Sequence, residues 1–393
     1  MIINRSYKTE LKLNNKEKTF CEKHAGVARF AWNWGLGRRI EEYQNTGTST
    51  DAMKQHKELN ALKKTDFPWM YDVSKCAPQQ SLRDLDKAYS NFFKGTAKFP
   101  KFKSKRHCKK SFRLTGTIRI FHSSIQLPRL GKLRLKEHNY LPLNPHILSV
   151  TVSEKAGLWF VSVNVEEDII VPENQGDTVG VDLGIKTMAY VSDGTTFDAP
   201  KPLKRYERRL KRANRHLSRT KNGSENRKKA INIVQKLHKK ISDIRTDALH
   251  KVTSQLTKTN SIIVLEDLNV SGMMKNHCLA KAISDIGLYE FRRQAEYKSQ
   301  WHGSIIIFAD RFYPSSKRCS SCGEIKHDLT LNDRTFICNN CGNIIDRDYN
   351  ASLNLKQVAD SSPDTSTPVR EESSGLCETI FNDSGNECQI LFG

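Results

Sequence analysis

The sequence has no apolar run long enough to cross a bilayer, and its first fifteen residues lack the apolar centre of a secretion signal. We therefore expect a cytoplasmic protein with no membrane partner. Cysteine is also sparse outside one short region, because six of the ten cysteines are scattered singly along the 393 residues. A disulfide framework is thus not expected, and a reducing compartment with one metal site is favoured.

Acidic residues are few relative to basic ones, and the deficit is uneven along the chain. The sequence carries 64 Lys and Arg against 43 Asp and Glu, a formal net charge of +21. Residues 359–393 hold seven of the acids and one base, so residues 1–358 carry a net charge of +27. Such an excess favours a polyanionic partner, and nucleic acid is the usual one. The alternative is a basic surface that only keeps the protein soluble.

Two segments concentrate the positive charge. Residues 98–113 alternate aromatic and basic side chains, which suits stacking on exposed bases and contacts to phosphates, although a solvated edge strand is an equal alternative. Residues 204–219 form a predicted helix in which Glu207 is the one acid, so only Glu207 offers the i,i+4 ion pairing that an ordinary solvated helix has throughout. The candidate nucleic-acid contacts are Lys101, Lys103, Lys105, Arg106, Arg205, Arg208, Arg209, Arg212, Arg215 and Arg219.

Four cysteines near the C-terminal end form two CxxC pairs separated by fifteen residues. Each pair predicts a tight knuckle, and two knuckles supply the four thiolates of a structural zinc site in a zinc ribbon. Gly323 and Gly342 directly follow the knuckles and permit the turns. Two pairs disfavour a redox role, and four unrelated core cysteines are the alternative. The predicted zinc ligands are Cys319, Cys322, Cys338 and Cys341.

Three carboxylates each adjoin a predicted apolar strand or a helix start. Asp182 follows Val-Gly-Val, Glu266 follows Ile-Ile-Val-Leu, and Asp348 opens a helix after the cysteine module. An acid at the end of an apolar strand is costly to bury unless it is paired or binds a cation. Together the three acids favour Mg²⁺ binding and phosphodiester chemistry. Considered singly, each acid has another interpretation. Asp182 is then a turn residue, Glu266 the start of a loop and Asp348 a helix N-cap.

The apolar periodicity divides the chain into regions. Residues 1–13 alternate as a strand, the next region repeats at helical spacing, and residues 117–171 indicate several strands of a small β-barrel. A second domain begins near Thr178 with an apolar strand. The predicted domains are a β-barrel of residues 1–13 and 96–176, a helical insert of 14–95, an α/β domain of 177–315 and 343–358, a zinc ribbon of 316–342, and a disordered acidic tail of 359–393.

These residues together resemble the TnpB family, which are transposon-encoded RNA-guided nucleases, also called OrfB-type transposases, related to type V CRISPR effectors. The likeness runs from about residue 2 to residue 358. The matching blocks, in chain order, are APQQSLRDLDKAYSNFFKG, FPKFKSKRHCKKSFRL, GVDLGIKTMAYVSDG, NRHLSRTKNGSENRKKA, IVLEDLNVSGMMKN, YPSSKRCSSCG and CGNIIDRDYNASLNL.

The resemblance implies an α/β RNase H-like core of the RuvC type with an inserted zinc ribbon, and an N-terminal β-barrel wedge domain carrying a helical recognition insert. It implies that Asp182, Glu266 and Asp348 are catalytic. Asp348 is preferred to Asp346 because the family's motif places the catalytic Asp two residues before an Asn, here Asn350. Asp346 would then be a neighbour that pairs with Arg347.

The resemblance also implies what the protein works with. A guide RNA and double-stranded target DNA are the expected partners, Zn²⁺ is the structural ion and Mg²⁺ the catalytic one. The expected location is the prokaryotic cytoplasm, acting at the nucleoid. The rival hypothesis is a DNA-binding transposase or transposition accessory protein without guided cleavage. The acid order Asp, Glu, Asp disfavours the usual acid-triad transposases, which end in Glu, and a zinc-ribbon regulator would leave the three acids unexplained.

Overall fold

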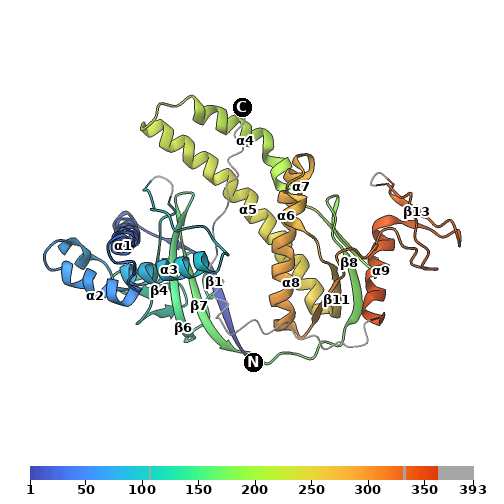
Figure 1. The fold of residues 1–393 in the computed structure, drawn as a ribbon, viewed down its shortest axis with the longest axis horizontal. Helices are drawn as coiled ribbons and strands as arrows, with labels where there is room; N and C mark the ends of the chain where they lie inside the picture. The colour runs from blue at the N-terminus through green and yellow to red at the C-terminus, as the bar shows by residue number, and fades with distance from the viewer. Residues whose placement is uncertain (106–107, 331–332, 362–393) are drawn as a thin grey trace. The chain divides into compact units, whose positions relative to one another are not determined.

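The computed structural model describes residues 1–105, 108–330 and 333–361. The chain divides into two compact units, Met1–Asp168 and Ile169–Gly393 (Figure 1). Within the described residues, none of the helices combines the length and apolar character needed to span a membrane. The acidic tail predicted from residue 359 lies almost wholly outside the described residues.

The first unit is built on one antiparallel sheet of seven strands, in the order β2-β6-β7-β1-β5-β4-β3. Alternate residues of β7, such as Val161, Val163 and Val165, are buried, as expected for a strand with one face on a core. No pairing between the edge strands β2 and β3 is recorded among the described residues, so the sheet is not closed into the predicted barrel. The strands are β1 (Ile2–Lys12), β2 (Ser111–Leu114), β3 (Arg119–Phe121), β4 (Ser124–Leu127), β5 (Gly131–Leu135), β6 (His146–Lys155) and β7 (Leu158–Asp168).

Helices fill the chain between β1 and β2, where the sequence predicts them. They are α1 (Asn15–Thr46), α2 (Ala52–Leu62), the 3₁₀ helix η1 (Pro68–Asp72) and α3 (Cys76–Phe93). Helix α1 begins with a capping box, because the Asn14 side chain accepts the N–H of Glu17 and the Glu17 carboxylate accepts the N–H of Asn14. It ends at Gly47, which adopts a left-handed conformation.

The second unit contains a mixed sheet of five strands, in the order β10-β9-β8-β11-β12. Strands β8 (Asp177–Asp182), β11 (Asn260–Glu266) and β12 (Ile305–Ala309) run parallel. Strands β9 (Thr187–Val191) and β10 (Thr196–Asp198) complete the sheet in antiparallel pairing. The helices are α4 (Pro202–Ser218), α5 (Glu225–Thr259), α6 (Val270–Met273), α7 (His277–Ile286), α8 (Leu288–His302) and α9 (Arg347–Ser361).

Helices cover both faces of the parallel strands, which explains why β11 is a continuous apolar run. On one face, Ile263 and Leu265 join a core with α5 and α8. On the other face, Val264 packs with Leu355 of α9. Figure 1 shows α8 and α9 on opposite sides of β8 and β11. The zinc-ribbon segment lies between β12 and α9 and contains one hairpin, β13 (Thr335–Ile337) with β14 (Ile344–Asp346).

Candidate carboxylate and metal sites

Two of the predicted catalytic acids end neighbouring strands. Strand β8 ends at Asp182 and β11 ends at Glu266, and Val181 is in register with Leu265. Because β8 and β11 run parallel, their carboxyl ends meet at the same edge of the sheet, which places the two acids side by side. The third acid, Asp348, lies in the first turn of α9.

A glycine allows α9 to bring Asp348 to this edge. A Cβ on Gly180 would lie 2.1 Å from the carbonyl oxygen of Ser352 and 2.4 Å from the amide nitrogen of Lys356. The backbone of α9 therefore rests directly on β8, two residues before Asp182. The ring of Tyr349, in the first turn of α9, also packs on Tyr190 of β9 with centroids 5.5 Å apart.

Asp182 experiences the charges of the other two acids. Burial raises the pKa of Asp182 to about 8, and the charges of Glu266 and Asp348 add to this effect. Burial also raises the pKa of Glu266, while a hydrogen bond from the buried Ser315 hydroxyl opposes the shift. Such coupled, perturbed carboxylates are typical of functional sites.

The structure separates the roles of Asp346 and Asp348. Asp346 accepts the backbone N–H groups of Asp348 and Tyr349, each at 3.0 Å, and so caps the N-terminus of α9. The capping alternative for Asp348 is therefore wrong. The expected pairing of Asp346 with Arg347 is also wrong, because the Arg347 guanidinium lies 3.1 Å from the Asp348 carboxylate. Among the described residues, the Asp348 carboxylate has no recorded backbone partner; it pairs with Arg347, and its charge acts on Asp182.

The carboxylates suit a cation that prefers oxygen ligands. The burial of Asp182 and its repulsion by Glu266 and Asp348 both disfavour the ionised form of Asp182, and a divalent cation would reverse that preference. Mg²⁺ takes one or two carboxylates and keeps several waters. The acids form an open edge and not a closed cage: within the described residues, the four cysteines are the one group gathered tightly enough for a single ion.

The four predicted zinc ligands meet in one cluster, where their sulfur atoms all lie within 4.8 Å of one another. Cys319 and Cys341 are 3.7 Å apart, and Cys322 and Cys338 are 3.5 Å apart. A tetrahedral zinc ion with Zn–S bonds of about 2.3 Å requires sulfur atoms about 3.8 Å apart, so the cluster fits zinc. Burial raises the pKa of Cys319, but hydrogen bonds from the Cys322 and Ser321 N–H groups prevail and lower it to about 6.

The two knuckles have the same backbone geometry. The N–H of Gly323 donates to the carbonyl of Cys319, and the N–H of Gly342 donates to the carbonyl of Cys338. Both glycines have positive φ, at 80° and 68° respectively, so the predicted need for glycine after each knuckle is confirmed.

Amide side chains connect the ribbon to α9. The buried Asn350 accepts the N–H of Ser320 at 2.9 Å and donates to the carbonyl of Arg318 at 2.7 Å. The buried Asn354 donates to the carbonyls of Arg318 and Ser315. The first knuckle is therefore held two residues from Asp348, which links the cysteine cluster to the carboxylates through a short, rigid path.

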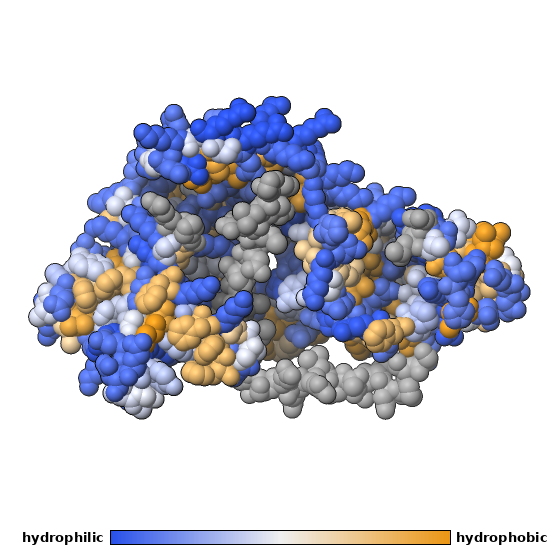
Figure 2. Space-filling view, turned by 45° about the horizontal axis from the view of Figure 1, so that its top comes forward, coloured by the Kyte–Doolittle hydropathy of each residue, from blue (hydrophilic) through white to orange (hydrophobic). Residues whose placement is uncertain are grey.

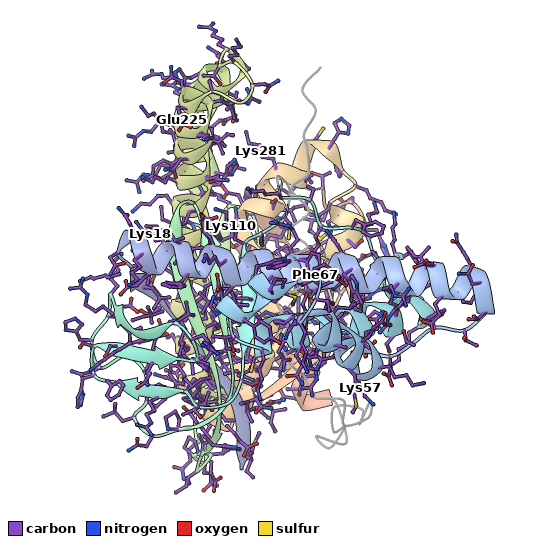
Figure 3. The ribbon with its side chains drawn as sticks, turned by 90° about the vertical axis from the view of Figure 1, so that its left-hand side faces the viewer. Lys18, Lys57, Phe67, Lys110, Glu225 and Lys281 are labelled. Atoms are coloured by element: carbon purple, nitrogen blue, oxygen red, sulfur yellow. The ribbon has the colours of Figure 1, made fainter. Side chains whose placement is uncertain are left out.

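The basic helix α4 presents its charge to solvent. Arg205, Arg208, Arg209, Arg212, Arg215 and Arg219 are all exposed. Glu207 is occupied by Lys211 at 3.0 Å and by Lys281 at 2.6 Å. Gly223 has positive φ, and the Ser224 side chain caps α5, so the chain turns between α4 and α5, which pack against each other as a hairpin. Figure 2 shows hydrophilic side chains over much of this hairpin, and Figure 3 shows side chains projecting from it near Glu225.

A single buried acid fixes the start of α4. Both oxygens of Asp285 accept the N–H of Leu203 at 3.0 Å, one of them also accepts the N–H of Lys204, and Arg245 pairs with the same carboxylate. A carboxylate at a helix N-terminus satisfies free N–H groups and the helix dipole. No local pattern predicts this contact, because Asp285 is separated from the start of α4 by about eighty positions.

The basic segment 98–113 is held against α1. Lys101 and Lys105 are exposed, whereas the Lys103 amine lies 3.4 Å from the centre of the Trp32 ring, and burial lowers its pKa. Asn33 hydrogen-bonds both the N–H and the carbonyl of Lys103. Lys103 is therefore partly used in packing, and Arg106 lies outside the described residues.

The chain matches three protein-family models. Residues 160–277 match a family described as "Probable transposase", residues 289–355 match "Cas12f1-like, TNB domain", and residues 1–48 match "Helix-turn-helix domain". The last match falls on β1 and the single long helix α1, so no helix-turn-helix is formed in the described residues there.

The chain is also similar to curated proteins over most of its length. It is 34% identical over 376 residues to the "Putative RNA-guided DNA endonuclease" of Streptomyces pristinaespiralis, covering 94% of this chain and 92% of the relative. It is 33% identical over 369 residues to the "Putative RNA-guided DNA endonuclease InsQ" of Escherichia coli K12, covering 89% and 91%. This chain belongs to the TnpB family.

A solved structure supports the fold of this TnpB-family chain. The Cas12f1 chain of a complex with guide RNA and target DNA superposes with a TM-score of 0.58 at 13% identity, covering 90% of this chain and 99% of the other. The similarity shows that the two proteins share a fold.

Proposed function

We propose that this TnpB-family protein is an RNA-guided, Mg²⁺-dependent DNA endonuclease with Asp182, Glu266 and Asp348 as its catalytic acids. The observation that carries the proposal is the convergence of two strand ends and one helix start on a single edge of the sheet. The strand order of β8 to β12 supports an RNase H-like core of the RuvC type. The names of the two bacterial relatives favour RNA-guided cleavage of DNA over other phosphodiester chemistry.

The three carboxylates would hold Mg²⁺ at the edge of the sheet. When bound, the ion supplies activation of the attacking water and stabilisation of the leaving oxygen. The remaining work belongs to protein groups. Ser315 orients the Glu266 carboxylate, Gly180 lets α9 approach, and the Asp346 cap fixes the turn that carries Asp348. Such preorganisation keeps the acids in place before substrate arrives.

The other parts of the chain have proposed roles in binding. Zn²⁺ at the four cysteines would keep the ribbon folded and α9 anchored. The exposed arginines of α4, with Lys101 and Lys105, would hold the phosphates of the guide RNA and target DNA. The sheet and the helices of the first unit would form the wedge and recognition regions, within the limits predicted from the sequence. Base pairing with the guide would then read the target.

The first test has two parts, on protein expressed with its native flanking DNA. We expect a discrete RNA to copurify, and Asp182→Ala to abolish DNA cleavage while retaining that RNA. Asp177→Ala is the matched control, because Asp177 is an exposed acid at the other end of β8. Cleavage by Asp182→Ala at the wild-type rate would overturn the site assignment.

The same experiment tests the rival function. The family model described as "Probable transposase" keeps a DNA-binding transposition protein in consideration. Such a protein needs no guide, so heterogeneous cellular RNA, or none, would favour it. The basic helix would then be a general phosphate contact.

A further inference from the structure

The turn after β12 holds an aromatic ring in solvent. Phe312 is 88% exposed, more than any other aromatic side chain in the part of the chain that the structure describes. The turn itself is fixed: the N–H of Phe312 donates to the Asp310 carboxylate at 2.8 Å, and the N–H of Tyr313 donates to the Asp310 carbonyl at 3.0 Å. The Tyr313 hydroxyl also donates to the carbonyl of Asn354 in α9 at 3.1 Å. A large apolar side chain is thus presented to water by a rigid support, where burial would be favourable.

This turn forms one wall of a cavity of about 340 Å³ that reaches the carboxylate edge. Glu266 and Asp267 line the same cavity from the end of β11, and Arg311, Phe312 and Lys317 line it from the turn. The exposed ring therefore stands at the same opening as a candidate catalytic acid. An isolated exposed Phe is ordinary. The position of this ring, at the opening that Glu266 also lines, makes it a candidate contact for substrate.

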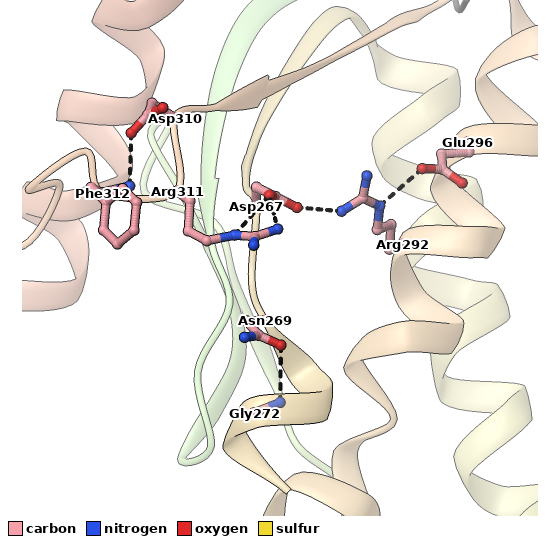
Figure 4. Close-up of polar contacts among 8 residues, drawn as sticks. All are labelled: Asp267, Asn269, Gly272, Arg292, Glu296, Asp310, Arg311 and Phe312. Atoms are coloured by element: carbon pink, nitrogen blue, oxygen red, sulfur yellow. Dashed lines mark hydrogen bonds and ion pairs between the residues drawn. The ribbon is translucent and has the colours of Figure 1, made fainter.

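A network of ion pairs orients the neighbouring cation. Asp267 accepts Nε and Nη2 of Arg311, at 3.1 and 2.5 Å, and its other oxygen accepts Nη1 of Arg292 at 2.6 Å. The Arg292 guanidinium is held in turn by Glu296 and lies over the Phe308 ring at 3.9 Å. Figure 4 shows Arg311 reaching toward Asp267 while the Phe312 ring stands apart from the network. The Arg311 side chain is therefore held in one orientation. Its Nη1 has no acceptor recorded among the described residues.

We propose that Phe312 is a stacking platform for an unpaired base of the strand that is cut, with Arg311 and Lys317 facing its phosphates. The inference rests on the proposed function and adds a positioning residue to it. An exposed aromatic ring beside cations is the usual means of holding single-stranded nucleic acid without regard to sequence. The platform requires an unpaired base, because both faces of a base within a duplex are already covered. The ring would therefore place the strand beside Glu266 only after the duplex has opened.

Phe312 substitutions test the platform in the full-length protein with its copurified guide RNA. Phe312→Ala should lower kcat/KM for DNA cleavage roughly 5- to 100-fold, which corresponds to the loss of one base stack. Phe312→Trp should retain cleavage within about twofold, because the larger ring also stacks. Tyr289→Ala is the matched control and should cleave normally, since Tyr289 is 68% exposed in the same unit but does not line the cavity. Full activity in Phe312→Ala would overturn the proposal.

A spectroscopic readout separates this proposal from the proposed function. In Asp182→Asn protein, a 2-aminopurine base next to the cleavage position should be quenched by stacking, and Phe312→Ala added to this background should restore its fluorescence. Unchanged quenching would overturn the platform even if guided cleavage is established. If the wild-type protein cuts no DNA, the proposed function fails. Quenching of a labelled single strand by the full-length protein, lost in Phe312→Ala, would still support the platform, and its absence would overturn it.

Discussion

Gly180→Ala should displace the helix that carries Asp348. The added methyl would lie 2.1 Å from the Ser352 carbonyl oxygen and 2.4 Å from the Lys356 nitrogen, both backbone atoms of α9 that no rotamer change can move. An ordinary contact of about 3.4 Å requires α9 and β8 to separate by about 1 Å. Overpacking costs about 1–3 kcal/mol, and the rigid backbone contacts place this substitution near 3 kcal/mol.

Two measurements follow from that separation. A loss of about 3 kcal/mol should lower the Tm of the second unit by roughly 6–12 °C, followed by circular dichroism. A shift of about 1 Å in Asp348 should slow single-turnover DNA cleavage up to about 100-fold at saturating guide and target. Binding of guide RNA should be unchanged, because α9 carries none of the proposed RNA contacts.

Gly26→Ala is the control for replacing glycine itself. Gly26 lies inside α1, has no positive φ, and a Cβ there would meet no atom within 4 Å. This variant should be neutral or up to about 1 kcal/mol more stable, because alanine favours the helix. Wild-type Tm and cleavage in Gly180→Ala would refute the close packing of α9 on β8 and, with it, the reason that Asp348 reaches the site.

Three other predictions follow from the site. Asp346→Ala should lose about 1 kcal/mol of stability with the helix cap but keep most of its cleavage activity. Asp348→Ala should lose cleavage with little change in Tm, and equal losses of cleavage in the two variants would refute the division of roles. With chelator present, Asp182→Asn should be more stable than the wild type. Because the folded-state pKa of Asp182 is raised, the difference in unfolding free energy between the two proteins should grow from about pH 4 to about pH 8 and then level. Thermal scans that show a constant difference across pH would refute this. Asp285→Asn should loosen the start of α4 and so weaken the affinity for guide RNA, as a binding titration would show. Mg²⁺-dependent cleavage measured at saturating RNA should persist.

The sequence predicts those parts of the site that depend on neighbouring residues. The cysteine spacing defines both knuckles, and apolar runs ending in acid place Asp182 and Glu266 at strand ends. These patterns are local, so a single sequence contains them. Asp348 could be chosen over Asp346 only by resemblance, because both acids have the same local context and the difference lies in which one accepts the α9 N–H groups.

Contacts between distant segments could not be predicted. The Ser315 hydroxyl on Glu266 and the Asp285 carboxylate under α4 join residues from different elements, and neither has a distinctive spacing. Strands β3 to β7 follow from the alternation of apolar and polar residues in 117–171. Whether the sheet closes depends on its curvature and on the pairing of its edge strands. The sequence pattern predicts Lys103 as a phosphate contact because it shows a basic residue without showing the Trp32 ring that the amine packs on.

The junction between the ribbon and α9 has a consequence for how this protein can diverge or be redesigned. Asn350 and Asn354 bond to the backbone of residues 315–320, not to their side chains. A peptide group is the same whatever residue bears it, so the surface side chains of the first knuckle can be exchanged without breaking the junction. The ribbon can therefore acquire new surface contacts while the two asparagines keep the register of the helix. Grafting a foreign four-cysteine ribbon onto this core should succeed wherever the knuckle backbone is preserved.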